Sequence, residues 1–397
     1  MTMTSHAQAS RTRLALPALA LGSFTISTSE FASMGLLPLF AGELGLDVPH
    51  ATHAITAYAL GVVVGAPLLT LAAARMDRRM LLIALMLLAA VANVASALAP
   101  DLGLLVLGRF LSGLPQGAYF GAAAVVATRI VGSGRSGSAV AVVMGGITLA
   151  TVIGAPAGTW IGQEAGWRLA YALIGALSLL SLVALGAGLP RLPGLAGGSV
   201  RGELAALTRA NIWIMIVITA LAIASTFGVY TFVGPLVSGV AGMEDGMVPL
   251  ALVLIGLGMA VGNVIGGRLA DIWTFRAIGL GFGVTMAVLA LMGLLAANGP
   301  ALMVLFFCIG VAVMIGTPSI PVRMMHMAPE APTLMGALNM AAFNVANAIG
   351  AAAGGLTIEA GLGLTSPIWA GLALTGLGLA LFAVAYRYLN ATRDGAA

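Results

Sequence analysis

Two charged residues, Glu30 and Arg109, lie inside long apolar segments and are the first candidates for chemistry. Glu30 is near the middle of the run 14–40, and Arg109 lies within the run 102–128. A charge in hydrocarbon costs about 3 kcal/mol or more, so such a residue usually faces a cavity or a partner. Glu30 is therefore a candidate proton carrier, and Arg109, at a similar depth, is a candidate partner that tunes it. The alternatives are a hydrogen-bonded structural acid and a structural clamp between helices.

Other polar and aromatic side chains inside apolar runs could line a substrate cavity. Three asparagines of the run 334–358 fall within about 140° of arc, at 100° per residue. They could line a cavity or form hydrogen bonds between helices, and single aromatic residues could equally be packing. The cavity candidates are Met34, Gln116, Tyr119, Phe227, Tyr230, Asn339, Asn344 and Asn347.

The composition places most of the chain in lipid. Of its 397 residues, 60% are hydrophobic and only 8% are charged, whereas soluble domains carry about 25% charged residues. Segments of about 20 apolar residues span a bilayer as helices. The sequence predicts an all-α membrane protein with spans near 14–40, 53–74, 80–99, 102–128, 138–162, 168–190, 211–237, 247–270, 277–297, 300–321, 334–358 and 364–388.

The arginines give these twelve spans a direction. With the N-terminus in the cytoplasm, every arginine except Arg109 and Arg168 falls in a cytoplasmic loop or tail. Because cytoplasmic loops are enriched in basic residues, both termini are expected in the cytoplasm, with the protein in an inner (cytoplasmic) membrane. Arginines spread over segment ends do not form one basic face, so nucleic acid is not an expected partner.

The two halves of the chain resemble each other. Pro38 aligns with Pro235 at an offset of 197 residues, and VIGAPAGTWIG (152–162) aligns with AIGAAAGGLTI (348–358) at 196. The repeat predicts an N-terminal six-helix bundle over 1–190, a cytoplasmic linker over 191–210 and a C-terminal six-helix bundle over 211–397. Two parallel repeats of this kind bind their cargo near the midplane of the membrane.

Enzyme motifs are missing from the sequence. There is no phosphate loop, zinc spacing or nucleophile elbow, and the single cysteine, Cys308, excludes a disulfide framework. We expect no enzyme activity, no cofactor and no bound metal. The expected partners are a small-molecule substrate, protons and the bilayer, with the protein acting as a monomer.

Two further groups of residues point to moving parts. The arginines 75, 78, 79 and 276, with Asp77 and Asp271, could form a charge lock on the cytoplasmic side, although positive-inside topology explains the arginines alone. Gly154, Pro156 and Gly158 of GAPAG give one span a smooth face with a pliable point. That face could be a hinge or seal, or ordinary close packing.

Four stretches resemble the major facilitator superfamily, in its twelve-helix drug/proton antiporter branch. They are TSEFASMGLLP (28–38), TLAAARMDRR (70–79), GRFLSGLPQGAYFG (108–121) and GAPAG (154–158) followed by GWR (166–168). The chain is most similar to bacterial sugar-efflux, nucleoside-efflux and chloramphenicol-resistance permeases. It departs from the pattern at Ala74, where an aspartate is usual, at Asp77, where glycine is usual, and at Gln116, where relatives often carry histidine.

The resemblance implies a secondary active transporter that exports a drug, sugar or nucleoside by proton antiport and alternating access. An uptake symporter or uniporter of the same fold is the first alternative. A membrane sensor that does not transport is the alternative from another class.

Overall fold

The computed structural model describes residues 2–72, 76–131, 136–190, 208–328 and 332–391, and the described parts are built from helices without strands. The contacts divide the chain into two compact units. Unit 1 comprises Met1–Leu44 and Ala57–Gly197, and unit 2 comprises Gly45–Thr56 and Gly198–Ala397. The segment between the first two long helices thus groups with unit 2.

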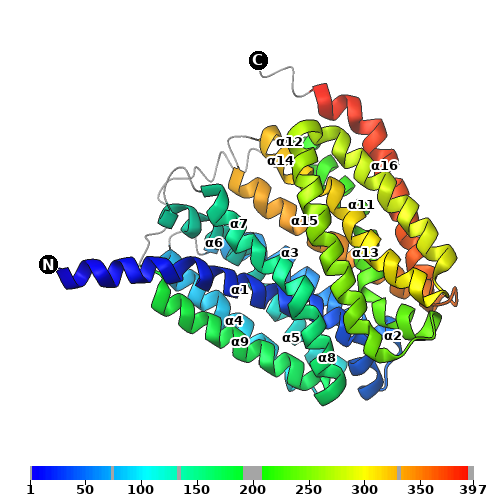
Figure 1. The fold of residues 1–397 in the computed structure, drawn as a ribbon, viewed down its shortest axis with the longest axis horizontal. Coiled ribbons are helices and arrows are strands. Elements are labelled where there is room, and N and C mark those ends of the chain that lie inside the picture. The colour runs from blue at the N-terminus through cyan, green and yellow to red at the C-terminus, as the bar shows by residue number, and fades with distance from the viewer. Residues whose placement is uncertain (1, 73–75, 132–135, 191–207, 329–331, 392–397) are drawn as a thin grey trace. The chain divides into compact units, whose positions relative to one another are not determined.

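Unit 1 is built around α1, the long blue helix of Figure 1, which contacts α6, α7, α8 and α9. Two of the expected spans are interrupted helices: Leu114 separates α5 from α6, and a π-helical segment, η1, separates α7 from α8. The bounds are α1 Thr2–Glu43, α3 His53–Ala72, α4 Arg78–Ala97, α5 Leu102–Gly113, α6 Pro115–Val131, α7 Ser136–Leu149, η1 Ala150–Gly154, α8 Ala155–Ala165 and α9 Trp167–Gly188.

Unit 2 repeats this arrangement, but one of its helices, α12, contains two membrane spans joined end to end. In α12 the backbone leaves helical geometry at Trp273 (φ −135°, ψ 45°), which divides the helix into the two spans expected from sequence. The bounds are α2 Val48–Ala51, α11 Ala210–Thr231, η2 Pro235–Val240, η3 Asp245–Met247, α12 Val248–Leu295, α13 Gly299–Gly316, α14 Ser319–Met327, α15 Pro332–Glu359 and α16 Ser366–Ala391.

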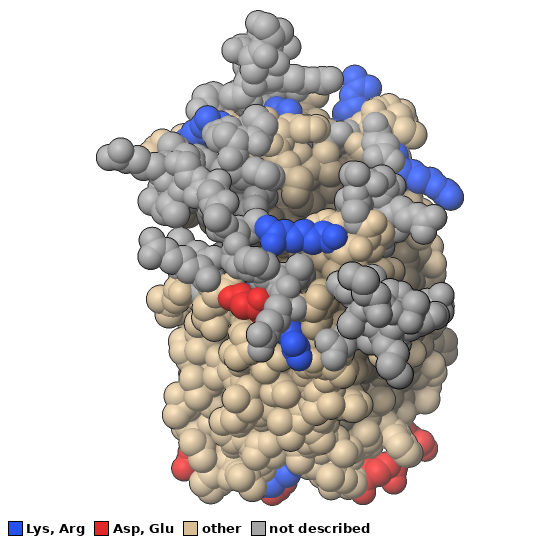
Figure 2. Space-filling model, turned by 90° about the vertical axis from the view of Figure 1, so that its left-hand side faces the viewer, with Lys and Arg blue, Asp and Glu red and all other residues tan. Residues whose placement is uncertain are grey.

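Eleven helices in the described residues are long and apolar enough to cross a membrane. The helix outside this set is α1, whose central turns carry serines, threonines and Glu30, which lower its hydropathy. With α1 as the twelfth, the expected twelve-helix membrane fold is confirmed. Large apolar side chains such as Val91, Val183 and Val384 are exposed, as lipid contact requires. On the face drawn in Figure 2, charged side chains lie in the upper part and at the lower edge, and the band between them is uncharged.

The internal repeat extends to contacts between helix backbones. In unit 1 the backbones of α3 and α5 are in direct contact at two glycines. A Cβ on Gly61 of α3 would overlap the carbonyl of Phe110, and a Cβ on Gly113 of α5 would overlap the carbonyl of Tyr58. In unit 2, Gly258 and Gly310 make the same contacts with Phe307 and Ile255, each 197 residues later.

A helix cap repeats at the same offset. The side chain of Asp101 accepts the backbone N–H of Leu104 at 2.9 Å, and that of Asn298 accepts the N–H of Ala301 at 3.0 Å. Both cap the start of a helix, α5 in unit 1 and α13 in unit 2. The two units therefore share one scaffold, against which their different side chains can be compared.

Candidate functional site

The middle of α1 is a buried polar stripe within unit 1. Apolar residues normally fill the centre of a membrane helix, so a stripe of this kind requires partners on the surrounding helices. Each side chain of the stripe is at most 5% exposed: Ser23, Thr25, Ser27, Thr28, Ser29, Glu30 and Ser33.

Arg109 of α5 reaches this stripe and is completely buried. Its Nη2 donates to the carbonyl oxygen of Ser29 at 2.8 Å, and its Nη1 donates to the Ser29 hydroxyl at 3.0 Å. The guanidinium also lies over the rings of Tyr58 and Tyr171, 4.6 and 5.1 Å from their centroids. Such cation–π contacts suit a desolvated arginine, so α3, α5 and α9 together hold this charge against α1.

Glu30 takes its hydrogen bond from a different helix. The amide Nε2 of Gln116, on α6, donates to Glu30 Oε2 at 2.8 Å. Two ion pairs of the described residues, Asp47–His50 and Glu43–Arg168, lie outside this network. Arg109 binds the residue that precedes Glu30, and the structure brings Glu30, Gln116 and Arg109 into one buried network.

Three members of this network were not singled out from the sequence. Ser29 and Asn93 bond to each other and to Arg109, and Tyr171 donates its hydroxyl to Ser33 at 3.0 Å. The signal for Asn93 was present, since it is a lone amide inside the apolar run 80–99. The ring of Tyr171 carries no such signal, because its contact with Arg109 depends on tertiary packing.

Tyr119 and Met34, two of the cavity candidates, are packed inside unit 1. The Tyr119 hydroxyl donates to the Leu19 carbonyl at 3.0 Å, and its ring fills the space beside Gly22. Met34 is fully buried. In this conformation Tyr119 anchors α6 to the backbone of α1.

The GAPAG segment lies directly against α1. A Cβ on Gly154 would overlap the side chain of Thr28, and one on Gly158 would lie 2.9 Å from the Ala32 Cβ. The π-helical segment η1 ends at Gly154, two residues before Pro156. A proline removes a backbone donor and π-helical turns often mark functional sites, so packing and a pliable point coexist here.

The loop arginines have mixed surroundings. Asp77 caps α4 by accepting the backbone N–H of Met80 at 3.1 Å, and Arg79 donates to the Gly186 carbonyl near the end of α9. Arg78 is buried and Arg276 is exposed. Arg75 and the side chain of Asp271 lie outside the described residues.

In unit 2 the cavity candidates lie on two helices that pack together, α11 and α15. Phe227 and Tyr230 of α11 are buried, as are Asn344 and Asn347 of α15, while Asn339 is partly exposed. Asn344 Nδ2 donates to the Met340 carbonyl at 3.1 Å within its own helix. This bond directs the carbonyl oxygen of the Asn344 amide away from its own helix backbone.

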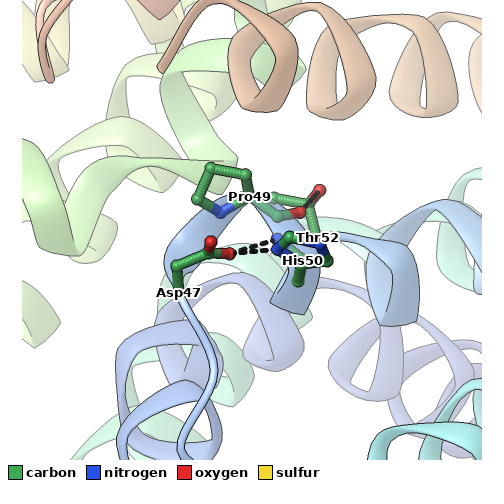
Figure 3. A network of polar contacts seen from close by, with 4 residues as sticks. All are labelled: Asp47, Pro49, His50 and Thr52. Atoms are coloured by element: carbon green, nitrogen blue, oxygen red, sulfur yellow. Dashed lines mark hydrogen bonds and ion pairs between the residues drawn. The ribbon is translucent and has the colours of Figure 1, made fainter. Parts of the chain in front are cut away.

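A polar turn in unit 2 contains the ion pair between Asp47 and His50 (Figure 3). Asp47 accepts the backbone N–H of His50 at 2.9 Å and lies 2.6 Å from His50 Nδ1. The His50 N–H bond, followed by the ring contact, lowers the pKa of the Asp47 carboxyl below its ordinary value of 3.8. Thr52 donates to the Pro49 carbonyl and lies against Gly355 of α15, so α2 is seated on that helix.

Residues 19–351 match the family model of the Major Facilitator Superfamily. The chain is 39% identical to the Inner membrane transport protein YdhP of Escherichia coli (strain K12) over 366 residues, 92% of this chain and 94% of the relative. It is 32% identical to a Chloramphenicol resistance protein of Streptomyces lividans over 374 residues, 92% of this chain and 94% of the relative.

The fold is also that of a solved transporter. A bacterial homolog to the human lysosomal transporter Spinster, in an inward-facing and occupied conformation, superposes with a TM-score of 0.74 at 14% identity. The match covers 94% of this chain and 96% of the other. From its family model, its relatives and its helices, the chain belongs to the Major Facilitator Superfamily and is a multi-pass inner-membrane transporter of a small molecule.

Proposed function

We propose that this transporter exports a small organic compound in exchange for protons, with Glu30 as the proton carrier. The observation that carries the proposal is the position of Glu30. It is 5% exposed in the polar middle of α1 and bonded to Gln116 at 2.8 Å. A carboxyl group in such a place gains or loses its proton only when water or cargo reaches it, which is the property that a coupling site needs.

Arg109 supplies the second part of the proposed coupling site. It places a permanent positive charge one residue from Glu30 in a buried environment, where electrostatic interactions are strong. Its direct partners are neutral oxygens and aromatic rings. We propose that this permanent charge tunes proton binding at Glu30.

The direction of transport is supported by one relative, and the arginine pattern supports the orientation of the chain in the membrane. The Streptomyces lividans relative is named a chloramphenicol resistance protein, and resistance is a property that export of a drug can give. The arginine bias favours both termini in the cytoplasm. The proposed cargo is a drug, a sugar or a nucleoside.

The remaining sequence candidates have proposed roles in the same cycle. Buried and half-buried polar and aromatic side chains of unit 2 are the candidates for contact with the cargo there. For unit 2 we propose Phe227, Tyr230, Asn339, Asn344 and Asn347, on α11 and α15. We propose that η1 and Pro156 form a pliable point on α8 and that Arg276 and Asp271 contribute to a cytoplasmic lock.

The test is proton movement driven by cargo in everted membrane vesicles. Vesicles with an acidified lumen are exposed in turn to a panel of drugs, sugars and nucleosides, and a fluorescent dye follows the lumenal pH. A substrate of the antiporter should release protons from vesicles with the wild-type protein and not from those with Glu30→Gln. Glu164→Gln, the same change at an exposed position, is the control and should behave as the wild type.

Unchanged, pH-dependent export by Glu30→Gln would remove Glu30 from the proton pathway. The symporter alternative has a different signature, because cargo and protons would then enter right-side-out vesicles together. The uniporter alternative predicts transport without any proton movement.

A further inference from the structure

We propose that Asn93, together with Ser29, is a positioning residue that holds the Arg109 guanidinium beside Glu30 and so sets the pH dependence of transport. This inference rests on the proton-coupled function proposed above. It assigns a role to a residue of α4 that acts through Arg109.

Asn93 has its amide fixed in one orientation. Its Nδ2 donates to the carbonyl of Ala89, one turn earlier in α4, at 2.8 Å. The amide oxygen therefore points to the other side, where it accepts the Ser29 hydroxyl at 2.7 Å and lies 3.5 Å from Arg109 Nη1. Asn93 is 1% exposed, so water does not compete for this oxygen.

Ser29 connects the amide to the guanidinium. Its hydroxyl donates to Asn93 and accepts from Arg109 Nη1 at 3.0 Å, while its carbonyl accepts from Nη2 at 2.8 Å. The guanidinium is thus held in two places on one residue, and one of these bonds depends on the orientation that Asn93 gives to the hydroxyl. Without Asn93 the hydroxyl is free to turn, and the guanidinium loses a fixed acceptor.

The position of this charge matters because Ser29 immediately precedes Glu30. The carbonyl that Arg109 binds belongs to the peptide group joining Ser29 to Glu30. The interaction between two charges in a buried environment falls with their separation and is weakly screened. A small displacement of the guanidinium therefore changes how readily Glu30 binds a proton, even without a direct bond between them.

Unit 2 indicates that the packing of the helices does not need this network. At the repeat offset of 197 residues, Asn93 corresponds to Ala290 and Arg109 to Phe306. The contacts of Gly61 and Gly113 are nevertheless reproduced by Gly258 and Gly310. The pair formed by α3 and α5 can thus be packed without a buried arginine, which favours a functional over a purely structural role for Arg109, the residue through which Asn93 acts.

The test is the pH profile of transport by purified protein in liposomes. Asn93→Leu keeps the side-chain size and removes the amide, and we expect its profile to move by about 1 pH unit, equal to about 1.4 kcal/mol. Ser29→Ala, which removes the linking hydroxyl, should move the profile less. The matched control is Ser181→Ala, which breaks the buried 3.0 Å bond between Thr25 and Ser181 in the same unit. It should leave the profile in place.

The possible outcomes separate this inference from the proposed function. If Glu30→Gln removes the pH dependence but Asn93→Leu and Ser29→Ala keep the wild-type profile, the positioning role is wrong and the proton function stands. If Ser181→Ala moves the profile as far as Asn93→Leu, general loosening explains the shift and the inference is also overturned. If Glu30→Gln retains the pH dependence, the proposed function itself fails. If Asn93→Leu does not fold, Ser29→Ala decides alone. A shifted pH profile of Ser29→Ala supports the inference, and an unshifted profile overturns it.

Discussion

The two units share one scaffold and differ in what they bury inside it. The backbone contacts of Gly61 and Gly113 recur at Gly258 and Gly310, yet the buried arginine of unit 1 corresponds to Phe306 in unit 2. Gln116 likewise corresponds to Val313, and Glu30 to Thr226 or Phe227 at offsets of 196 or 197. The repeat therefore separates the residues that build the fold from those available for function, and it places the buried residues Glu30 and Arg109 in unit 1.

The largest expected effect concerns the shared scaffold. Gly113→Val and Gly310→Val should each prevent folding, because the new Cβ would overlap a backbone carbonyl that cannot move aside. Overpacking of this kind costs about 3 kcal/mol or more when backbone is involved. The amount of folded protein in membranes and its melting temperature are the measurements.

Gly121→Val and Gly283→Val are the matched controls, since a Cβ at either position meets nothing within 4 Å. Both controls should fold normally. If only one of Gly113→Val and Gly310→Val prevented folding, the backbone contacts of the two units would not be equivalent.

The next effect should differ between the units. Arg109→Met removes the charged donor that binds the Ser29 carbonyl and the Ser29 hydroxyl, and each hydrogen bond from a charged group contributes about 1.5–3 kcal/mol. The transport rate per folded molecule should fall tenfold or more. Phe306→Met in unit 2 exchanges one buried apolar side chain for another and should change the rate less than about twofold.

Rates in liposomes, normalised to folded protein, are the measurement for this pair. Equal losses in the two variants would remove the distinction between a functional and a structural arginine.

A smaller effect is expected at the Glu30 partner. Gln116→Met removes the amide that donates to Glu30, and a hydrogen bond to a charged group contributes about 1.5–3 kcal/mol. The maximal transport rate should fall by about tenfold and the pH profile should change shape. Val313→Leu, at the corresponding place in unit 2, should change neither, and a pH profile of Gln116→Met identical to that of the wild type would argue against the bond.

The smallest effect concerns the polar turn of unit 2. Asp47 has a lowered pKa, so the stability that its carboxylate gives the turn is present above the ordinary carboxyl pKa of 3.8 and is lost as pH falls through the lowered value. Asp47→Asn should weaken protection of the amides of residues 48–52 without affecting unit 1. Hydrogen exchange, corrected for its intrinsic pH dependence, measures the protection of these amides. Equal protection in Asp47→Asn and the wild type would show that the ionised carboxylate is not needed.

Much of the fold followed from composition and spacing. The apolar runs predicted the spans, and the repeat offset of 197 proved to be the offset of the backbone contacts and of the caps Asp101 and Asn298. Hydropathy does not show where a helix is interrupted, so the break at Leu114 and the π-helical η1 and η2 were not predicted.

The members of the buried network in unit 1 could be picked out from the sequence only in part. Glu30 and Arg109 were visible because charges are rare in spans, and the structure joins them through Ser29. Their partners were harder to find, since serine and tyrosine are ordinary residues in a membrane helix. The pairing of Gln116 with Glu30, and of Asn93 with Ser29, depends on how helices far apart in sequence face each other.

The most direct test of the central claim is the number of protons exchanged when cargo binds to the purified transporter. Calorimetry in buffers of different ionisation enthalpy gives this number at a fixed pH. The account predicts that the wild type and Thr226→Val, in unit 2, release about one proton per bound substrate and that Glu30→Gln releases none. Proton release by Glu30→Gln equal to that of the wild type would contradict the claim that unit 1 couples transport to protons through Glu30.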